Sequence, residues 1–214
     1  MTRAKNYNQF LTERLLAVSQ SAELMVDFGA GLGTIADELR KRGRTVMCIE
    51  PDAALNEYLR TRNFSVFRTL GDLPSASISF IYSLNVLEHI EDDYTVLAEM
   101  YSRLEPGGRL YLYVPAFQIL FSSMDRKVGH FRRYQRGHLS NLLRAVGLKP
   151  LSARYVDSLG FLATLVYRLV GSRYGDLPES PLATYDRYCL PLSLRLDRLL
   201  FRCIGKNLEI LAIK

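Results

Sequence analysis

The sequence predicts an α/β fold, in which helices cover both faces of a largely parallel sheet. Short apolar runs alternate with segments of helical periodicity from about residue 24 onward, as in successive βαβ units. The first apolar run, LMVDF at 24–28, leads into a glycine-rich turn and then a helix. With 214 residues, 48% of them hydrophobic and 23% charged, the chain can bury the core of one domain spanning 1–214.

The elements follow from periodicity and from stop signals. An amphipathic pattern predicts a helix at 7–20, and Asp52 is placed to cap the helix expected at 52–62. Pro106-Gly107-Gly108 is a helix stop signal. Further helices are expected at 34–42, 52–62, 92–104 and 137–146. Strands are expected at 24–28, 45–50, 64–68, 77–84, 109–114 and 149–157.

The turn after the first strand has the composition of a nucleotide site. Gly29, Gly31 and Gly33 let the backbone approach a ligand, and the N-terminus of the following helix offers free N–H groups. A dinucleotide fingerprint would have Gly or Ala where Thr34 stands, and the carboxylate of Asp27 would repel a pyrophosphate. The same carboxylate suits a ligand with an ammonium and a sulfonium group, which describes S-adenosylmethionine (SAM).

A second carboxylate completes this pattern. Glu50 ends the strand predicted at 45–50, where an acidic side chain can accept hydrogen bonds from both ribose hydroxyls of a nucleotide. With Asp27 and Glu50 in these positions, the sequence resembles the class I SAM-dependent methyltransferases, whose first motif reads (D/E)xGxGxG. A glycine-rich turn without a ligand is the alternative, and the two carboxylates count against it.

The resemblance extends along the chain. SLNVLEHIEDD at 83–93 and LEPGGRLYLYVPA at 104–116 are similar to the small-molecule branch of this family, the type 11 and type 12 groups. The segment from VPA at 114–116 to GHFRRY at 129–134 is similar to a bacterial subgroup that modifies small or lipid-linked acceptors.

The resemblance implies a fold and a cofactor site. The sheet would be Rossmann-like, doubly wound and seven-stranded, with NLEILAIK at 207–214 as an antiparallel seventh strand. A helical insertion at 158–205 would then separate strands 6 and 7 and roof the acceptor side, with an apolar wall formed by Phe161, Leu165, Tyr167 and Leu169. The expected SAM-binding residues are Asp27, Gly29, Ala30, Gly31, Gly33, Glu50, Pro51, Asp72, Leu73 and Asn85. For the adenine, either Asp72 or the backbone N–H of Leu73 alone is expected to make the contact.

The acceptor is expected at the segment that follows the fifth strand. His130 is the candidate general base, because the ordinary pKa of an imidazole lies near neutral pH, and Asp125 and Tyr134 are the other catalytic candidates. Arg132 and Arg133 could bind a carboxylate or phosphate of the substrate. The alternative is a surface loop pinned by pairing between Asp125 and an arginine.

Charge and composition limit the partners. Residues 1–124 carry 12 basic and 15 acidic side chains, whereas residues 125–214 carry 16 and 7. The basic C-terminal part favours an anionic acceptor or peripheral contact with a membrane surface, with ordinary solubility as the alternative. Arg195, Arg198 and Arg202 share one helix face, which is typical of an interfacial helix and equally of a packed one. No transmembrane segment or signal peptide is expected, and we expect a cytoplasmic protein.

Other partners are disfavoured. The three cysteines lack metal-site spacing, so no metal is expected, and no Asn/Asp-Pro-Pro-aromatic tetrad follows the fourth strand, which argues against nucleic-acid methylation. Two other functions stay open. One is a nicotinamide-dependent oxidoreductase, and the other is a SAM-binding regulator without turnover.

Overall fold

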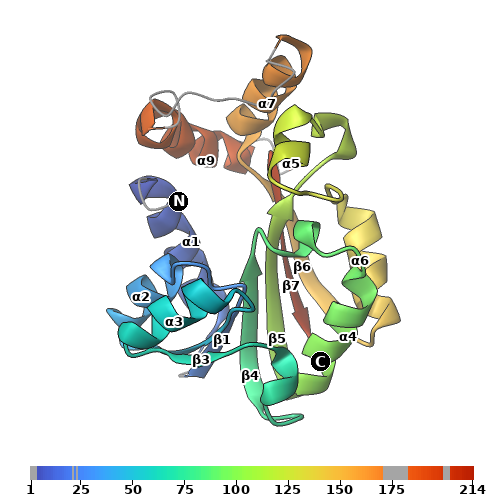
Figure 1. Ribbon diagram of the computed structural model, residues 1–214. Coiled ribbons are helices and arrows are strands. Elements are labelled where there is room, and N and C mark those ends of the chain that lie inside the picture. The colour runs from blue at the N-terminus through green and yellow to red at the C-terminus, as the bar shows by residue number, and fades with distance from the viewer. Residues whose placement is uncertain (1–3, 21, 23, 171–182, 200–202) are drawn as a thin grey trace.

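The computed structural model describes residues 4–20, 22, 24–170, 183–199 and 203–214, which form a central sheet with helices on both faces (Figure 1). The strands are Leu24–Phe28 (β1), Thr45–Ile49 (β2), Ser65–Phe67 (β3), Ile78–Leu84 (β4), Leu104–Pro115 (β5), Lys149–Val156 (β6) and Asn207–Ile213 (β7). In the described part of the chain they form a seven-stranded sheet of order β3-β2-β1-β4-β5-β7-β6. β7 runs antiparallel to β5 and β6, and the other neighbours are parallel. This confirms the predicted Rossmann-like, doubly wound sheet with an antiparallel seventh strand.

One face of the sheet is covered by the helices that begin the chain. These are Lys5–Val18 (α1), Thr34–Arg40 (α2) and Ala53–Thr61 (α3). Their buried leucines, among them Leu15, Leu39 and Leu59, form one core cluster with Tyr82 and Tyr111 of the central strands. Within each helix the apolar side chains recur at helical spacing, which places them on the side that faces the sheet.

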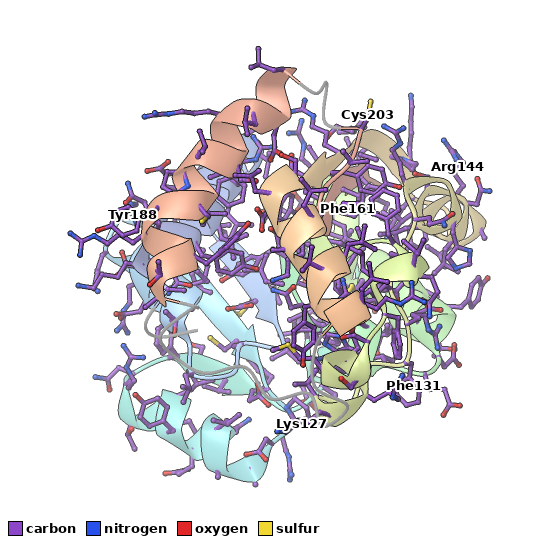
Figure 2. All side chains as sticks on the ribbon, turned by 90° about the horizontal axis from the view of Figure 1, so that it is seen from above. Lys127, Phe131, Arg144, Phe161, Tyr188 and Cys203 are labelled. Carbon is purple, nitrogen blue, oxygen red and sulfur yellow. The ribbon has the colours of Figure 1, made fainter. Side chains whose placement is uncertain are left out.

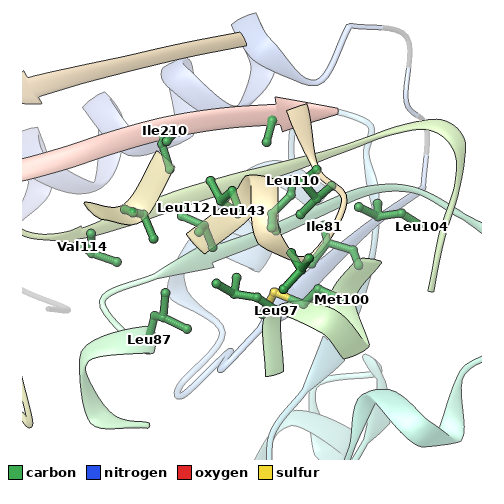
Figure 3. Packing of buried hydrophobic residues seen from close by; sticks show 14 of the residues in the cluster. Ile81, Leu87, Leu97, Met100, Leu104, Leu110, Leu112, Val114, Leu143 and Ile210 are labelled. Carbon is green, nitrogen blue, oxygen red and sulfur yellow. The ribbon is translucent and has the colours of Figure 1, made fainter. Parts of the chain in front are cut away.

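The opposite face is covered by Asp93–Arg103 (α4) and Arg136–Ala145 (α6). Leu97 and Met100 of α4 pack with Leu143 of α6 against Ile81 and Leu110 of the sheet (Figure 3). Both faces of β1, β4 and β5 are therefore buried, which explains why these strands read as nearly continuous apolar runs. The strand order reverses between β1 and β4, and in such sheets the ligand crevice lies at the carboxyl ends beside that point.

Most predicted elements agree with the structure to within two residues, and β5 differs most. It begins at Leu104 instead of 109, because Leu104 pairs with Ile78 of β4 and the register then shifts before Phe80. Pro-Gly-Gly thus lies in an irregular part of the strand. The predicted cap of α3 is present, since Oδ1 of Asp52 accepts the backbone N–H groups of Ala54 and Leu55, each at 2.9 Å.

The insertion between β6 and β7 is helical, as predicted. It contains Ser158–Val170 (α7), a π-helical turn at Tyr185–Cys189 (η4) and Leu190–Leu199 (α9). Seen from above, α7 and α9 lie nearest to the viewer, above the carboxyl ends of the parallel strands (Figure 2). The carboxylate of Asp197 accepts the N–H groups of Asp157 at 2.8 Å and Ser158 at 2.9 Å, which joins α9 to the start of α7. Within the predicted insertion, residues 171–182, Arg202 and the side chain of Arg198 lie outside the described residues.

None of the helices in these described ranges combines the length and the apolar character needed to cross a bilayer.

Candidate active site

The glycine turn after β1 is shaped by three left-handed residues. Gly29, Gly31 and Gly33 have φ values of 80°, 56° and 68°. A Cβ on Gly29 would lie 2.4 Å from the side chain of Val86, and one on Gly33 would lie 2.5 Å from Leu59, so packing requires glycine at both positions. A Cβ on Gly31 would meet nothing within 4 Å. Gly31 therefore faces open space where a ligand can approach the backbone.

Glu50 lies against this turn. The residue is 6% exposed, and its carboxylate accepts the N–H of Gly31 at 2.7 Å and that of Asp52 at 3.1 Å. A carboxylate has about four lone-pair sites, so acceptor capacity remains for ribose hydroxyls. The structure thus brings Glu50 and Gly31 together. Pro51, the next residue in the chain, is exposed. Ala30 lies inside the turn, and its N–H donates to the carbonyl of Ile49.

Asp27 lies on β1 just before the turn and is 4% exposed. Burial raises the pKa of this carboxyl to about 7. The hydroxyl of Tyr82 opposes this rise, and the charge of Glu50 adds to it. An ionised carboxylate in such surroundings is costly unless a cation lies nearby. The open space at Gly31, the acceptor at Glu50 and the buried carboxylate at Asp27 therefore fit the nucleoside and the cationic amino-acid part of SAM.

The residues predicted for the adenine are occupied within their own turn. Oδ2 of Asp72 accepts the N–H groups of Arg68 and Thr69 at 3.2 and 3.0 Å. The N–H of Leu73 donates to the carbonyl of Leu70 at 3.0 Å. The N–H of Leu73 is therefore already bonded, whereas the exposed carboxylate of Asp72 keeps acceptor capacity, so an adenine contact through Asp72 stays a prediction.

Asn85 joins the glycine turn to a cavity. It follows β4 with a φ of 54°, and its N–H donates to the Tyr113 carbonyl at 2.7 Å. Its Nδ2 donates to the hydroxyl of Tyr7, in α1, at 3.0 Å. Both side chains line a cavity of about 310 Å³. The segment 122–134 contributes Asp125, His130 and Arg133 to the lining.

Asp125 is the central acceptor of that segment. It accepts from Nε and Nη2 of Arg133 at 2.9 and 3.0 Å, from the N–H of Ser122 at 2.8 Å, and lies 2.8 Å from Nδ1 of His130. Burial alone would raise the pKa of Asp125, but the hydrogen bonds from His130 and Arg133 outweigh it and hold that pKa well below its ordinary value. An ionised carboxylate only accepts, so Nδ1 of His130 carries a proton, and in the neutral imidazole Nε2 has the lone pair.

Arg132 and Tyr134 lie outside the described lining of the cavity. Arg132 forms an ion pair with Asp93 at 2.8 Å, and its Nη2 donates to the Glu91 carbonyl at 2.6 Å. The hydroxyl of Tyr134, on a fully buried side chain, donates to Asp93 at 2.9 Å. These two residues therefore brace the segment against the start of α4. Pairing between Asp125 and Arg133 also pins the segment, as the surface-loop alternative expected, but on the cavity side.

Several lining residues were not predicted. Tyr7, Glu88, Tyr185 and Lys206 all face the cavity, whereas the apolar wall expected from Phe161, Leu165, Tyr167 and Leu169 is absent from its described lining. The buried hydroxyl of Tyr7 and its bond to Asn85 have no counterpart in a local sequence pattern. Glu88 lies in the SLNVLEHIEDD segment, to which the sequence assigned no side-chain role apart from Asn85, and Tyr185 belongs to an insertion without recognisable motifs. Only packing brings these side chains together.

Comparison with known proteins gives the family. A family model described as a methyltransferase domain matches residues 2–153. The chain belongs to this methyltransferase-domain family. It is 31% identical over 103 residues to a malonyl-[acyl-carrier protein] O-methyltransferase of Serratia marcescens, a match that covers 45% of this chain and 40% of that protein. The chain spans only 40% to 51% of the length of the curated relatives that it matches.

Solved methyltransferases share the fold of this domain. A SAM-dependent methyltransferase from Archaeoglobus fulgidus superimposes with a TM-score of 0.65 at 16% identity, covering 97% of this chain and 94% of that one. Phosphoethanolamine N-methyltransferase 2 of Haemonchus contortus, solved with SAM, has a TM-score of 0.62 at 16% identity, with 98% and 52% covered. The family and the fold together support SAM as the cofactor of this methyltransferase domain, as the sequence predicted.

Proposed function

We propose that this methyltransferase domain transfers a methyl group from SAM to an oxygen or nitrogen of a small or lipid-linked acceptor. The observation that carries the proposal is the cavity beside Asn85, which contains the Asp125–His130 pair and adjoins the carboxyl end of β4. Methyl transfer is a displacement that requires a nucleophile held in line and a site for its proton. The cavity offers a place for the acceptor and, at His130, a site for its proton. The similarity of the 114–134 segment to the bacterial subgroup supports a small or lipid-linked acceptor.

The cofactor residues have separate tasks in this proposal. When bound, SAM supplies a methyl group activated by its sulfonium. Glu50 would accept hydrogen bonds from the ribose, Gly31 leaves room for the ligand, and Asp27 offers a negative charge to the cationic end. Asn85, held between Tyr7 and Tyr113, would fix the boundary between cofactor and acceptor.

The acceptor residues act as a proton site and a support. Asp125 fixes the ring of His130, so that Nε2 can receive the proton of an acceptor hydroxyl or amine. Arg133 is neutralised by Asp125 and therefore acts as a positioning residue instead of the predicted anion-binding residue. Lys206 lies in the same lining, where burial lowers the pKa of its amine.

A lipid-linked acceptor is supported by the outer surface of the insertion. Leu162, Val166 and Leu169 follow each other on α7 at intervals of four and three and are all more than half exposed. Leu192 and Leu199 on α9 are also exposed, next to the exposed Arg195. An apolar stripe with a basic residue suits peripheral contact with an anionic membrane, where such an acceptor would reside.

The test separates cofactor binding from turnover. Methyl-labelled SAM is incubated with the protein and a small-molecule and lipid extract, and the labelled product is identified by mass spectrometry. His130→Gln should abolish labelling and leave SAM affinity within about twofold, because Nε2 is the proton site. Glu50→Ala should instead weaken SAM binding, measured by calorimetry, by roughly 1.5–3 kcal/mol, because a charge-assisted acceptor is lost.

Three results would contradict the proposal. Unchanged SAM affinity in Glu50→Ala with an intact fold would remove the cofactor site. Full labelling by His130→Gln would remove the proton site. SAM binding without labelled product from any extract would favour the alternative of a SAM-binding regulator.

A further inference from the structure

Glu88 is a buried carboxylate with no compensating partner of its own. It lies in the short helical turn Leu87–His89 (η2) and is fully buried. Neither carboxylate oxygen has a hydrogen-bond partner among the described residues. Removing a carboxylate from water without donors is costly, so such a group indicates that a proton or a cation is bound there.

Two histidines face this carboxylate. His130 Nε2 lies 3.9 Å from Oε1 of Glu88, and the ring of His89 meets that of His130 edge-on with centroids 4.6 Å apart. One ligand atom from each of the three residues lies within 4.8 Å of the others. A tetrahedral zinc ion with bonds of about 2.0 Å separates its ligand atoms by roughly 3.3 Å, so modest side-chain rotation would close the set.

The surroundings of the histidines match those of metal ligands. A ligating histidine usually donates its other ring N–H to a carboxylate or a carbonyl, which fixes the ring. Nδ1 of His130 lies 2.8 Å from Asp125, and the ring of His89 has a hydrogen-bond partner in the backbone of Gly129. Both rings are thereby oriented with the remaining nitrogen available. His89 is exposed, so the group can be reached from solvent.

We propose that Glu88, His89 and His130 bind a divalent transition-metal ion, with zinc as the best match to two imidazoles and a carboxylate. Three protein ligands leave at least one coordination position open, as in catalytic zinc sites. Glu88 and His130 also line the acceptor cavity, so an ion held by these residues would adjoin the acceptor.

This inference rests on the proposed function and makes it more specific. A metal ion at this place would select acceptors that offer an oxygen ligand, such as a hydroxyl beside a carboxylate or phosphate. With a metal bound, His130 would be a ligand instead of the proton acceptor, and the ion would supply Lewis acidity that lowers the pKa of a hydroxyl of the acceptor, so that its proton could pass to water.

The test measures metal binding without SAM or acceptor, so that its result is independent of methyl transfer. Tag-free protein is titrated with Zn²⁺ by calorimetry and with Co²⁺ by visible absorption. We expect one ion per chain, Co²⁺ bands in the visible range and no thiolate charge-transfer band. Glu88→Gln and His89→Ala should each weaken binding at least tenfold.

His138→Ala is the matched control. It removes the remaining histidine of the chain from an exposed position in α6 and should leave the affinity unchanged. Thermal melts establish that each variant is folded, and Glu88→Gln keeps the shape of the buried side chain. The inference is overturned if wild-type protein shows no saturable binding, or if Glu88→Gln and His89→Ala bind Zn²⁺ as tightly as wild type. Failure of SAM binding alone would overturn only the proposed function.

Discussion

At the residue scale, the buried carboxyl of Asp27 makes stability depend on pH. Its folded pKa of about 7 exceeds the ordinary value of 3.8, so the folded chain holds a proton that the unfolded chain has lost between these two pH values. The contribution of Asp27 to the stability of the free protein is therefore present at low pH and is lost as pH rises from about 4 through about 7. A cationic ligand next to Asp27 reverses this cost, because it favours the ionised form.

We predict opposite effects of Asp27→Asn on stability and on binding. At pH 8 the free variant should be more stable than wild type by roughly 1–4 kcal/mol, and the difference should vanish towards pH 4. SAM affinity at pH 8 should fall at the same time, because the negative charge is lost. Denaturant unfolding at several pH values and calorimetry check the two parts. A variant that is less stable at pH 8, or that binds SAM as wild type does, would show that Asp27 has another role.

At the element scale, α7 and α9 bury one side and expose the other. Phe161 of α7 packs edge-on against Phe117, with ring centroids 5.3 Å apart, and Leu190 of α9 is buried. Leu169 and Leu199 are 75% and 73% exposed, which is unusual for leucines in neighbouring helices. Tyr188, labelled in Figure 2, is also mostly exposed and precedes α9. These exposed faces are what a membrane surface would cover.

We predict that the protein co-sediments with anionic vesicles, and that binding fades as salt is added. Leu162→Glu combined with Val166→Glu should lower vesicle binding at least tenfold, because two charges then face the hydrocarbon boundary. Leu151→Glu, at a similarly exposed leucine of β6, is the control and should bind as wild type does. A wild-type protein that stays in the supernatant at low salt would contradict membrane contact and leave the insertion only as a cover of the cavity.

At the scale of the whole molecule, Asp186 fastens the start of α1 to the insertion. Its carboxylate accepts the N–H groups of Asn6 at 3.0 Å and Tyr7 at 2.9 Å, although about 180 residues separate the partners. The residue before α1, Ala4, has no side chain that could cap the helix. Asp186 therefore serves as a helix cap supplied by a distant element. This cap also fixes Tyr7, which bonds to Asn85 at the cavity.

Asp186→Ala should cost about 1–2 kcal/mol of stability and loosen α1 in particular. Amide exchange should rise for residues 6–12, and the cavity should lose its boundary at Tyr7. Asp92→Ala removes a cap of the ordinary local kind, since Asp92 accepts the N–H of Thr95 in α4 at 3.0 Å. It should cost a similar free energy and leave exchange in α1 unchanged. Equal exchange of α1 in both variants would mean that Asp186 does not hold the helix.

The sequence alone determined the sheet, the glycine turn and Glu50 as the carboxylate that lies against this turn. Apolar runs, Gly29, Gly31 and Gly33, and the acidic end of the second strand act over a few residues or one βαβ unit, where backbone rules are reliable. Tertiary structure decided the rest. Arg133 forms an ion pair with Asp125, whereas Arg132 forms one with Asp93, because neighbouring side chains point in different directions once the segment is packed. The cluster of Glu88, His89 and His130 and the distant cap at Asp186 arise from contacts between elements far apart in the chain, and no local pattern encodes them.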